Sequence, residues 1–239
     1  MNRPYIICHI LSALDGKIAG PFMEMQENIR AAKEYSHIRE EFNADAWLYG
    51  TTTTKEFTDF KKPDLSQVDE NIDDGDFVAN NQSDLYYVSV DTFGEIGWDS
   101  STYKRKGRKD AHIIEILVEN TSKKYRSYLR NKGISYIIAG KENLDCKLAV
   151  SKLKDLFGIE KMLICGGGIV NWTFVSQEVV DELSLLLSPV ADGENNTPTV
   201  FEHMLQSDDS KTVIFHLENV SQLPNDIVHL RYTIKKSEI

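Results

Sequence analysis

Three consecutive glycines are the residues of this chain best suited to holding a ligand, and they follow a short apolar segment. Glycines let the backbone approach a ligand closely, and free N–H groups at the start of a following helix attract phosphate. A tight strand-to-helix turn without a ligand is the alternative, although three glycines exceed what such a turn needs. The pattern is not the GxGxxG dinucleotide fingerprint. The sequence therefore predicts that Gly166, Gly167, Gly168 and the helix start that follows them bind phosphate.

A second polar turn follows the apolar segment that ends at Tyr49. Gly50 opens a run of four threonines, and the hydroxyl groups of Thr51 and Thr53 could hold phosphate or ribose oxygens. A polar cap before a short helix is the alternative. Both turns follow predicted parallel strands, and open α/β sheets bind ligands at the carboxyl ends of such strands. Together they predict a nucleotide site.

Several polar residues and one thiol are candidates for contacting a substrate. Asp15 lies just beyond that strand, although an Asp-Gly dipeptide is also a common turn. His9 could donate to a substrate or relay a proton, and a histidine hydrogen-bonded inside the fold fits the sequence equally well. Cys165 is a reactive thiol or a small buried residue.

One dense basic run stands out in an otherwise acidic chain, at residues 104–109. It could bind a substrate phosphate or the 2′-phosphate of a cofactor, or it could be a solvated loop. The acidic run at residues 69–76 is interpreted as a solvated loop.

Strands and helices alternate in the predicted order of elements. Apolar segments predict strands at residues 5–11, 46–49, 85–90, 113–118, 134–139 and 161–165. Apolar residues three or four apart predict helices at residues 27–43, 122–132 and 146–157, and residues 61–83 are predicted to form a loop or lid. Residues 182–190, 212–220 and 228–235 read as strands without helices between them. We therefore expect a three-layer αβα domain over residues 1–239, with a mostly parallel central sheet and antiparallel C-terminal strands.

The composition excludes several classes of function. A formal net charge of −10 opposes binding to nucleic acid and anionic membranes. No motif with metal-ligand spacing is present, and three cysteines without a CxxC pair predict reduced thiols. We expect a cytoplasmic protein that acts on a small molecule, without a metal.

In combination, these motifs resemble the reductase domain of riboflavin biosynthesis, within the dihydrofolate-reductase-like superfamily. The matching motifs are Arg3-Pro4-Tyr5, Leu14-Asp15-Gly16-Lys17-Ile18, Gly50-x-x-Thr53, Gly166-Gly167-Gly168, Val180-Asp181-Glu182-Leu183 and Ser188-Pro189. The resemblance implies a homodimer that binds NADPH through the two glycine-containing turns, with Asp15 on the substrate and nicotinamide side. The cofactor contacts that it implies are Gly50, Thr53, the three glycines and the helix start Ile169, Val170 and Asn171. It also implies hydride transfer to the ribose C1 of a phosphoribosylaminopyrimidine, as in 5-amino-6-(5-phosphoribosylamino)uracil reductase.

Departures from the family pattern fall at positions that the resemblance assigns to the substrate. His9 replaces a lysine, Ala13 replaces a serine with Ser12 one place earlier, and Cys165 replaces an acid. An expected Asp-Asn-Pro segment after Thr53 is absent, and Glu56 lies there instead. The substrate-side candidates are therefore Ser12, Asp15, Glu56 and Cys165, with His9 and Asp15 as the catalytic candidates. A pterin reductase and a nucleotide-binding module without catalysis are the alternatives.

Overall fold

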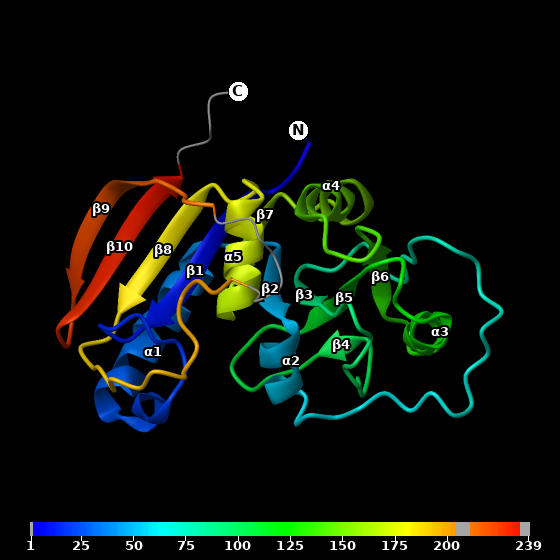
Figure 1. Cartoon of the computed structure of the whole chain (residues 1–239), viewed down its shortest axis with the longest axis horizontal. Helices are drawn as coiled ribbons and strands as arrows, with labels where there is room; N and C mark the ends of the chain where they lie inside the picture. The colour runs from blue at the N-terminus through cyan, green and yellow to red at the C-terminus, as the bar shows by residue number, and fades with distance from the viewer. Residues whose placement is uncertain (1, 204–210, 235–239) are drawn as a thin grey trace. The chain divides into compact units, whose positions relative to one another are not determined.

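The chain divides into two compact units in the computed structural model, which describes residues 2–203 and 211–234 (Figure 1). The first unit contains residues 1–4 and 45–162, and the second contains residues 5–44 and 163–239. Each unit contains strands and helices. The single domain expected over residues 1–239 stays a prediction.

The first unit has a sheet of mostly parallel strands. Its parallel strands, in spatial order, are β2 (Ala46–Gly50), β3 (Tyr86–Val90), β5 (Ala111–Leu117) and β6 (Ser135–Ile138), and β4 (Thr102–Tyr103) pairs antiparallel with β5. Its helices are α2 (Thr51–Phe57), α3 (Lys123–Asn131) and α4 (Cys146–Phe157). β7 (Lys161–Ile164) then leads into the second unit. Every residue of β3 and β5 is buried, as expected of parallel strands covered on both faces.

Local sequence signals set the ends of two helices in the first unit. The Ser122 hydroxyl accepts a hydrogen bond from the N–H of Tyr125 and caps α3. The Asp145 carboxylate caps α4 in the same way, and α4 ends at Gly158, whose φ of 68° lies in the left-handed region. Side-chain caps and a terminal glycine explain why these boundaries agree with the predicted ones.

The second unit combines a parallel strand pair with an antiparallel one. Its strands, in spatial order, are β1 (Tyr5–Ser12), β8 (Glu182–Leu187), β10 (Ile227–Ile234) and β9 (Phe215–Leu223). Its helices are the 3-10 helix η1 (Pro21–Glu24), α1 (Gln26–Glu41) and α5 (Gly168–Ser176). A buried cluster of Ala31, Ile38, Leu186 and Ile227 packs α1 against one face of this sheet. The mostly parallel α/β fold with antiparallel C-terminal strands is therefore confirmed.

Two strands differ from the predicted elements by three residues, because β8 ends three residues earlier and β9 lies three residues later than expected. The pairing between β9 and β10 is irregular between Arg231 and Tyr232, where the register shifts. Such an irregularity breaks the two-residue alternation that identifies a strand from its sequence. Among the described residues, no helix is long and apolar enough to cross a membrane.

The acidic run forms an extended segment that contacts α3 and β6, and we call residues 69–77 the acidic strap. Lys123 pairs with Asp74 at 3.0 Å and Lys152 pairs with Asp76 at 2.9 Å. Phe77 and Tyr136 exchange two backbone hydrogen bonds of 2.9 Å, which adds a bridge along β6. The loop predicted here is confirmed, and its charges are used in ion pairs within the first unit.

Candidate active site

The glycine turn of the second unit presents free backbone donors. Gly166 has a φ of 109°, a conformation that favours glycine, and its peptide bond to Gly167 is cis. Within the described ranges, the N–H groups of Gly168, Ile169 and Val170 have no protein acceptor, and the first turn of α5 has no acidic side chain. Unpaired N–H groups at a helix start carry partial positive charge. The turn can therefore bind a phosphate oxygen.

Residues 199–202 connect the glycine turn to the turn that contains Asp15. The N–H of Glu202 donates to the carbonyl oxygen of Gly168 at 3.1 Å, and the Asn171 amide donates to the Val200 carbonyl oxygen at 2.8 Å. The N–H of Val200 donates in turn to the Gly16 carbonyl oxygen at 3.0 Å. We call residues 199–202 the connecting segment. It brings two predicted parts of the site together within the second unit.

The side chain of Asn171 holds the connecting segment against α5. Asn171 is fully buried, and its amide nitrogen is committed to Val200. Its backbone N–H also donates to the Gly167 carbonyl oxygen inside the protein. Asn171 therefore supports the helix start, and the donors left for a ligand are the three N–H groups that precede it.

Asp15 is exposed and ionised. The N–H of Gly193 donates to its carboxylate at 3.0 Å, and this hydrogen bond lowers the pKa of Asp15. The neighbouring Lys17 forms a bridge with Thr199 of the connecting segment. A carboxylate with a lowered pKa accepts hydrogen bonds at neutral pH and does not act as a proton donor there. Asp15 can therefore orient a hydroxyl or amine of a substrate.

The side chain of His9 lies on the face of β1 that is turned away from the glycine turn. Its ring stacks on Tyr35 of α1 with 4.2 Å between ring centroids. The next residue, Ile10, lies 3.3 Å from the position that a Cβ on Gly166 would occupy. Successive side chains of a strand point to opposite faces, so His9 lies on the α1 face and the glycine turn on the face of Ile10. Burial lowers the pKa of His9 to about 3.

The hydrogen bonds of His9 define its tautomer. Nε2 lies 3.0 Å from the Tyr35 carbonyl oxygen, which only accepts, so Nε2 carries the proton. Nδ1 then accepts from the Ser184 hydroxyl at 3.0 Å, and Ser184 accepts from Nε2 of His229 at 2.8 Å. Both ring nitrogens of His9 are used inside the protein. These contacts fit the interpretation of a histidine bonded within the fold, so both ring nitrogens of His9 are occupied and the proposed reaction does not use them.

We expect the protein to lose stability as the pH falls below about 6.5, where unfolded histidine binds a proton. The pKa of folded His9 is about 3, so the folded state resists a protonation that the unfolded state accepts. At a pH of about 5, His9 alone would cost about 2 kcal/mol of unfolding free energy. Urea denaturation at neutral pH and at this lower pH measures the loss. The His9→Gln variant keeps a donor and an acceptor without titrating, and an equal loss in both proteins would contradict the assignment.

Two other substrate-side candidates of the second unit are buried. Ser12 is fully buried, and its hydroxyl donates to the Ala13 carbonyl oxygen at 3.0 Å. Cys165 has a relative exposure of 7% and directly precedes the glycine turn. Ser12 therefore lies inside the end of β1 and Cys165 lies beside the glycine turn, whereas Asp15 is exposed.

The second predicted turn lies in the first unit, where β2 ends and α2 begins. The Thr51 hydroxyl donates to the Val90 carbonyl oxygen at 2.6 Å, which joins the carboxyl ends of β2 and β3. Thr53 is half-buried, whereas Glu56 is exposed on α2. The structure therefore places Gly50, Thr51 and Thr53 at the sheet edge predicted for ligand binding.

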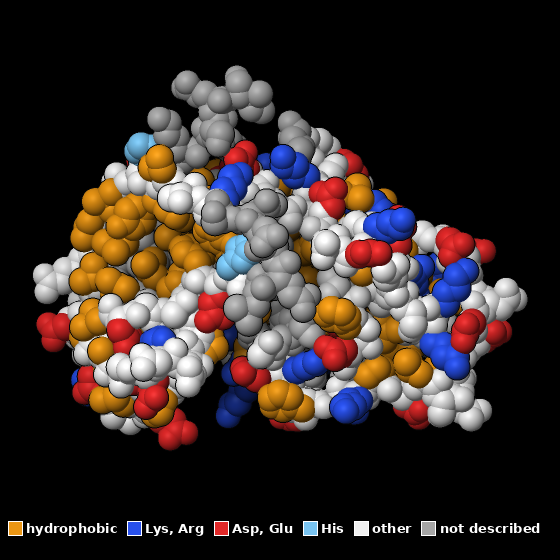
Figure 2. Space-filling view, viewed as in Figure 1, with side chains coloured by type: hydrophobic (Ala, Val, Ile, Leu, Met, Phe, Trp, Pro, Cys, Tyr) orange, Lys and Arg blue, Asp and Glu red, His pale blue; other side chains and the backbone are white. Residues whose placement is uncertain are grey.

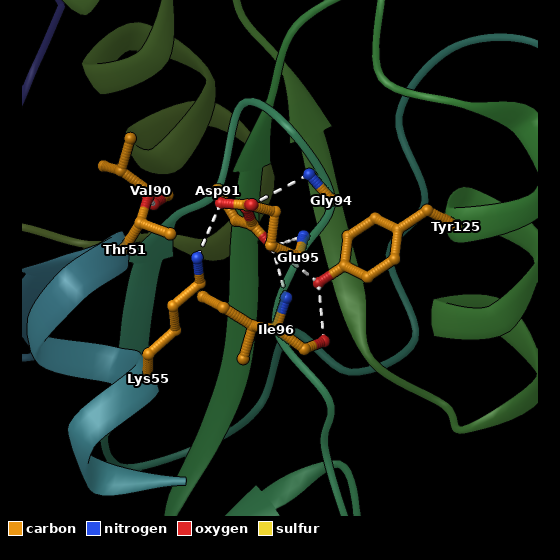
Figure 3. Close-up of polar contacts among 8 residues, drawn as sticks. All are labelled: Thr51, Lys55, Val90, Asp91, Gly94, Glu95, Ile96 and Tyr125. Carbon is orange, nitrogen blue, oxygen red and sulfur yellow. Dashed lines mark hydrogen bonds and ion pairs between the residues drawn. The ribbon is translucent and has the colours of Figure 1, made fainter. Parts of the chain in front are cut away.

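Asp91 organises the loop after β3, next to this turn (Figure 3). Its carboxylate accepts hydrogen bonds from the N–H groups of Gly94 at 3.1 Å, Glu95 at 2.8 Å and Ile96 at 2.9 Å. The Tyr125 hydroxyl also donates to it at 2.9 Å. Glu95 pairs with Lys55 of α2 at 2.7 Å, so the Asp91 loop and the Gly50 turn are held in one arrangement.

A second buried acid lies near Asp91. Glu115 of β5 is fully buried and accepts a hydrogen bond from the Trp98 indole at 2.6 Å. Burial, reinforced by the charge of Asp91, raises the pKa of Glu115 well above its usual range. Burial also raises the pKa of Asp91, although its hydrogen bonds oppose that rise. The two acids therefore favour a state in which Glu115 is protonated and Asp91 carries the charge.

Comparisons with sequences of known proteins relate this chain to pyrimidine reductases. The family model described as the RibD C-terminal domain matches residues 4–229. The 2,5-diamino-6-ribosylamino-4(3H)-pyrimidinone 5′-phosphate reductase of Aquifex aeolicus is 33% identical over 204 residues, which cover 84% of this chain and 83% of that protein. The protein of the same name from Methanothermobacter thermautotrophicus is 23% identical over 98% of this chain and 99% of its own length.

Solved structures show the same fold. A pyrimidine reductase-like protein from Corynebacterium diphtheriae superposes with a TM-score of 0.69 at 19% identity, covering 99% of this chain and 94% of that chain. RibD of Acinetobacter baumannii superposes with a TM-score of 0.66 at 18% identity, covering 98% of this chain and 58% of that chain. At these identities the likeness concerns the fold.

Proposed function

The chain belongs to the RibD C-terminal domain family, and on that basis we propose that it is an NADPH-dependent reductase of a phosphoribosylaminopyrimidine in riboflavin biosynthesis. The observation that carries this proposal is the 33% identity to the Aquifex aeolicus reductase over most of both chains. We propose the substrate in that protein's name, 2,5-diamino-6-ribosylamino-4(3H)-pyrimidinone 5′-phosphate.

The glycine turn supports binding of the cofactor phosphates. Three consecutive N–H groups at the start of α5 have no acceptor among the described residues, which leaves them for an anion. In the first unit, Gly50, Thr51 and Thr53 are the second set of proposed cofactor contacts, at the carboxyl ends of β2 and β3. Bound NADPH supplies the hydride, so the protein must mainly position cofactor and substrate.

Asp15 is the proposed substrate-orienting residue. Its carboxylate is exposed and ionised, and the connecting segment ties its turn to the glycine turn. A hydroxyl of the substrate's ribose is a suitable donor to it. Because Asp15 is a poor proton donor at neutral pH, its proposed role is to hold the ribose in position for reduction at C1.

The function is tested by mixing the purified full-length chain with NADPH and 2,5-diamino-6-ribosylamino-4(3H)-pyrimidinone 5′-phosphate. We expect NADPH oxidation that depends on this substrate and yields a ribityl product by mass spectrometry. Parallel reactions contain the deaminated aminouracil or dihydrofolate. Faster turnover of either one would reassign the substrate, and NADPH binding without oxidation of any of the three would identify a binding module.

We also propose a homodimer, formed through an aliphatic face of the second unit. On β8, β10 and β9, most of the residues opposite the α1 side are large and apolar. This open aliphatic face comprises Leu185, Leu187, Leu217, Val220, Val228 and Leu230. Leu217 and Val220 have relative exposures of 54% and 55%, and Figure 2 shows hydrophobic side chains gathered over these strands. A contiguous apolar patch of this kind suits a self-complementary interface.

We expect the protein to sediment at twice the 27.2 kDa mass of one chain. The Val220→Asp variant should sediment as a single chain, because it would bury a carboxylate in the interface. Asn219→Asp is the matched control, since the neighbouring residue of β9 points to the other side of the sheet. Analytical ultracentrifugation at micromolar concentration distinguishes the forms. A single-chain mass for the unmodified protein would refute the proposed dimer.

A further inference from the structure

Two arginines of the basic run flank a tight turn between β4 and β5. The N–H of Arg108 donates to the carbonyl oxygen of Arg105 at 3.0 Å, which closes the turn. Gly107 has a φ of 78°, a left-handed conformation that permits the turn at this position. We propose that Arg105 and Arg108 form a binding site for a phosphate monoester.

Aromatic rings hold both guanidinium groups. The guanidinium carbon of Arg105 lies 4.7 Å from the ring centre of Phe57, and that of Arg108 lies 5.6 Å from the ring centre of Trp47. Arg108 also donates to the Tyr49 hydroxyl at 3.3 Å. A guanidinium stacked on a ring is fixed in orientation while its N–H edge stays available, and that edge matches two phosphate oxygens. The aromatic contacts therefore preorganise the two arginines.

These guanidinium groups have no carboxylate partner in the part of the chain that the structure describes. The ion pair found within the basic loop joins Lys104 and Asp110 at 3.2 Å and does not involve either arginine. Arg231, by contrast, donates to both carboxylate oxygens of Glu182. Arg108 makes one side-chain hydrogen bond to protein out of five possible donors, so most of its donors remain for a ligand.

The charge of the pair selects the ligand. A phosphate monoester carries about −1.5 to −2 charges at neutral pH, which two guanidinium groups balance. The net charge of −10 disfavours a polyanion such as nucleic acid, so a single phosphate on a small molecule fits best. Resting on the proposed function, the two sources of such a group are the 2′-phosphate of NADPH and the ribose 5-phosphate of the substrate.

The test uses the full-length protein, the Arg105→Gln/Arg108→Gln double variant, and Lys106→Gln/Lys109→Gln as a control that removes equal charge from the same loop. Adenosine 2′-monophosphate and ribose 5-phosphate serve as probes in calorimetric titrations. We expect the arginine variant to weaken binding of one probe at least tenfold and the lysine variant to change it less than threefold. An Arg105→Lys/Arg108→Lys variant, which keeps the charge and loses the planar fork, should resemble the glutamine variant.

The kinetic readout separates the two sources. If the site binds the cofactor, the arginine variant loses affinity for NADPH and keeps its affinity for NADH. If it binds the substrate, the KM for the pyrimidine rises while NADPH affinity is unchanged. Unchanged binding of both probes in the arginine variant, or an equal loss in the lysine variant, overturns the proposal. Probe binding depends on no turnover, so a protein that binds a probe through these arginines but reduces no pyrimidine would contradict the proposed function alone.

Discussion

Replacing Gly168 with alanine should weaken NADPH binding at least tenfold, or by about 1.4 kcal/mol. An added Cβ would collide with the carbonyl oxygen of Thr199 and would lie 2.9 Å from Cγ of Glu202. The backbone atom cannot yield without moving the connecting segment. Because that segment also bonds to Gly16 and Asn171, the substitution would displace the helix start and the Asp15 turn together.

Calorimetric titration of NADPH into Gly168→Ala measures this loss, and thermal unfolding of the same variant shows whether it remains folded. Gly158→Ala is the control, because a Cβ on Gly158 would meet nothing within 4 Å, although Gly158, unlike Gly168, has a left-handed φ. We expect the control to lose about 1 kcal/mol of stability and to bind NADPH normally. If Gly168→Ala is folded and binds NADPH as tightly as the unmodified protein, the glycine turn is not the cofactor site.

Replacing Asp91 with asparagine should lower the unfolding free energy by about 3 kcal/mol or more. Its carboxylate accepts hydrogen bonds from three backbone N–H groups and from the Tyr125 hydroxyl. Asparagine has one acceptor oxygen, and its amide nitrogen would face donors that it cannot satisfy. The loop from Thr92 to Ile96 would loosen, and with it the Glu95–Lys55 pair that contacts α2.

Urea denaturation measures the stability of Asp91→Asn, and Asp64→Asn is its control. Asp64 is exposed and bonds to Ser66 two residues away, so its replacement should cost less than 1 kcal/mol. The role of Asp91 would be contradicted by equal stability losses in the two variants. At a temperature where Asp91→Asn is still folded, weaker NADPH binding would show that the loop supports the Gly50 turn.

The order of elements and the two turns could be predicted because each depends on neighbouring residues. Buried strands appear as apolar segments, and glycines after such a segment mark a turn whatever the rest of the fold does. The caps of α3 and α4 are likewise local, since Ser122 and Asp145 lie beside the helices that they begin.

The contacts that hold those turns in place could not be predicted from local sequence patterns. The connecting segment contacts Gly168 and Gly16 across long stretches of sequence, and nothing in residues 199–202 marks that contact. In the sequence, Asp91 precedes a glycine by three residues and is typical of an ordinary turn. Its role in holding the loop depends on the hydrogen bond from Tyr125, which is distant in the sequence. His9 lies in a strand that is almost entirely buried, so the sequence could not indicate which face its ring would occupy.

The acidic strap has a consequence for how copies of the protein can assemble. Exposed strand edges allow chains to add to one another without limit, and proteins suppress this by covering an edge or charging it. The strap does both at β6, since Phe77 occupies backbone groups of Tyr136 and the adjacent Asp74 and Asp76 form ion pairs with lysines there. A filament needs two available surfaces on every copy. With β6 covered in this way, the first unit offers one strand edge fewer for such growth, which favours a closed pair if copies meet through the proposed open aliphatic face.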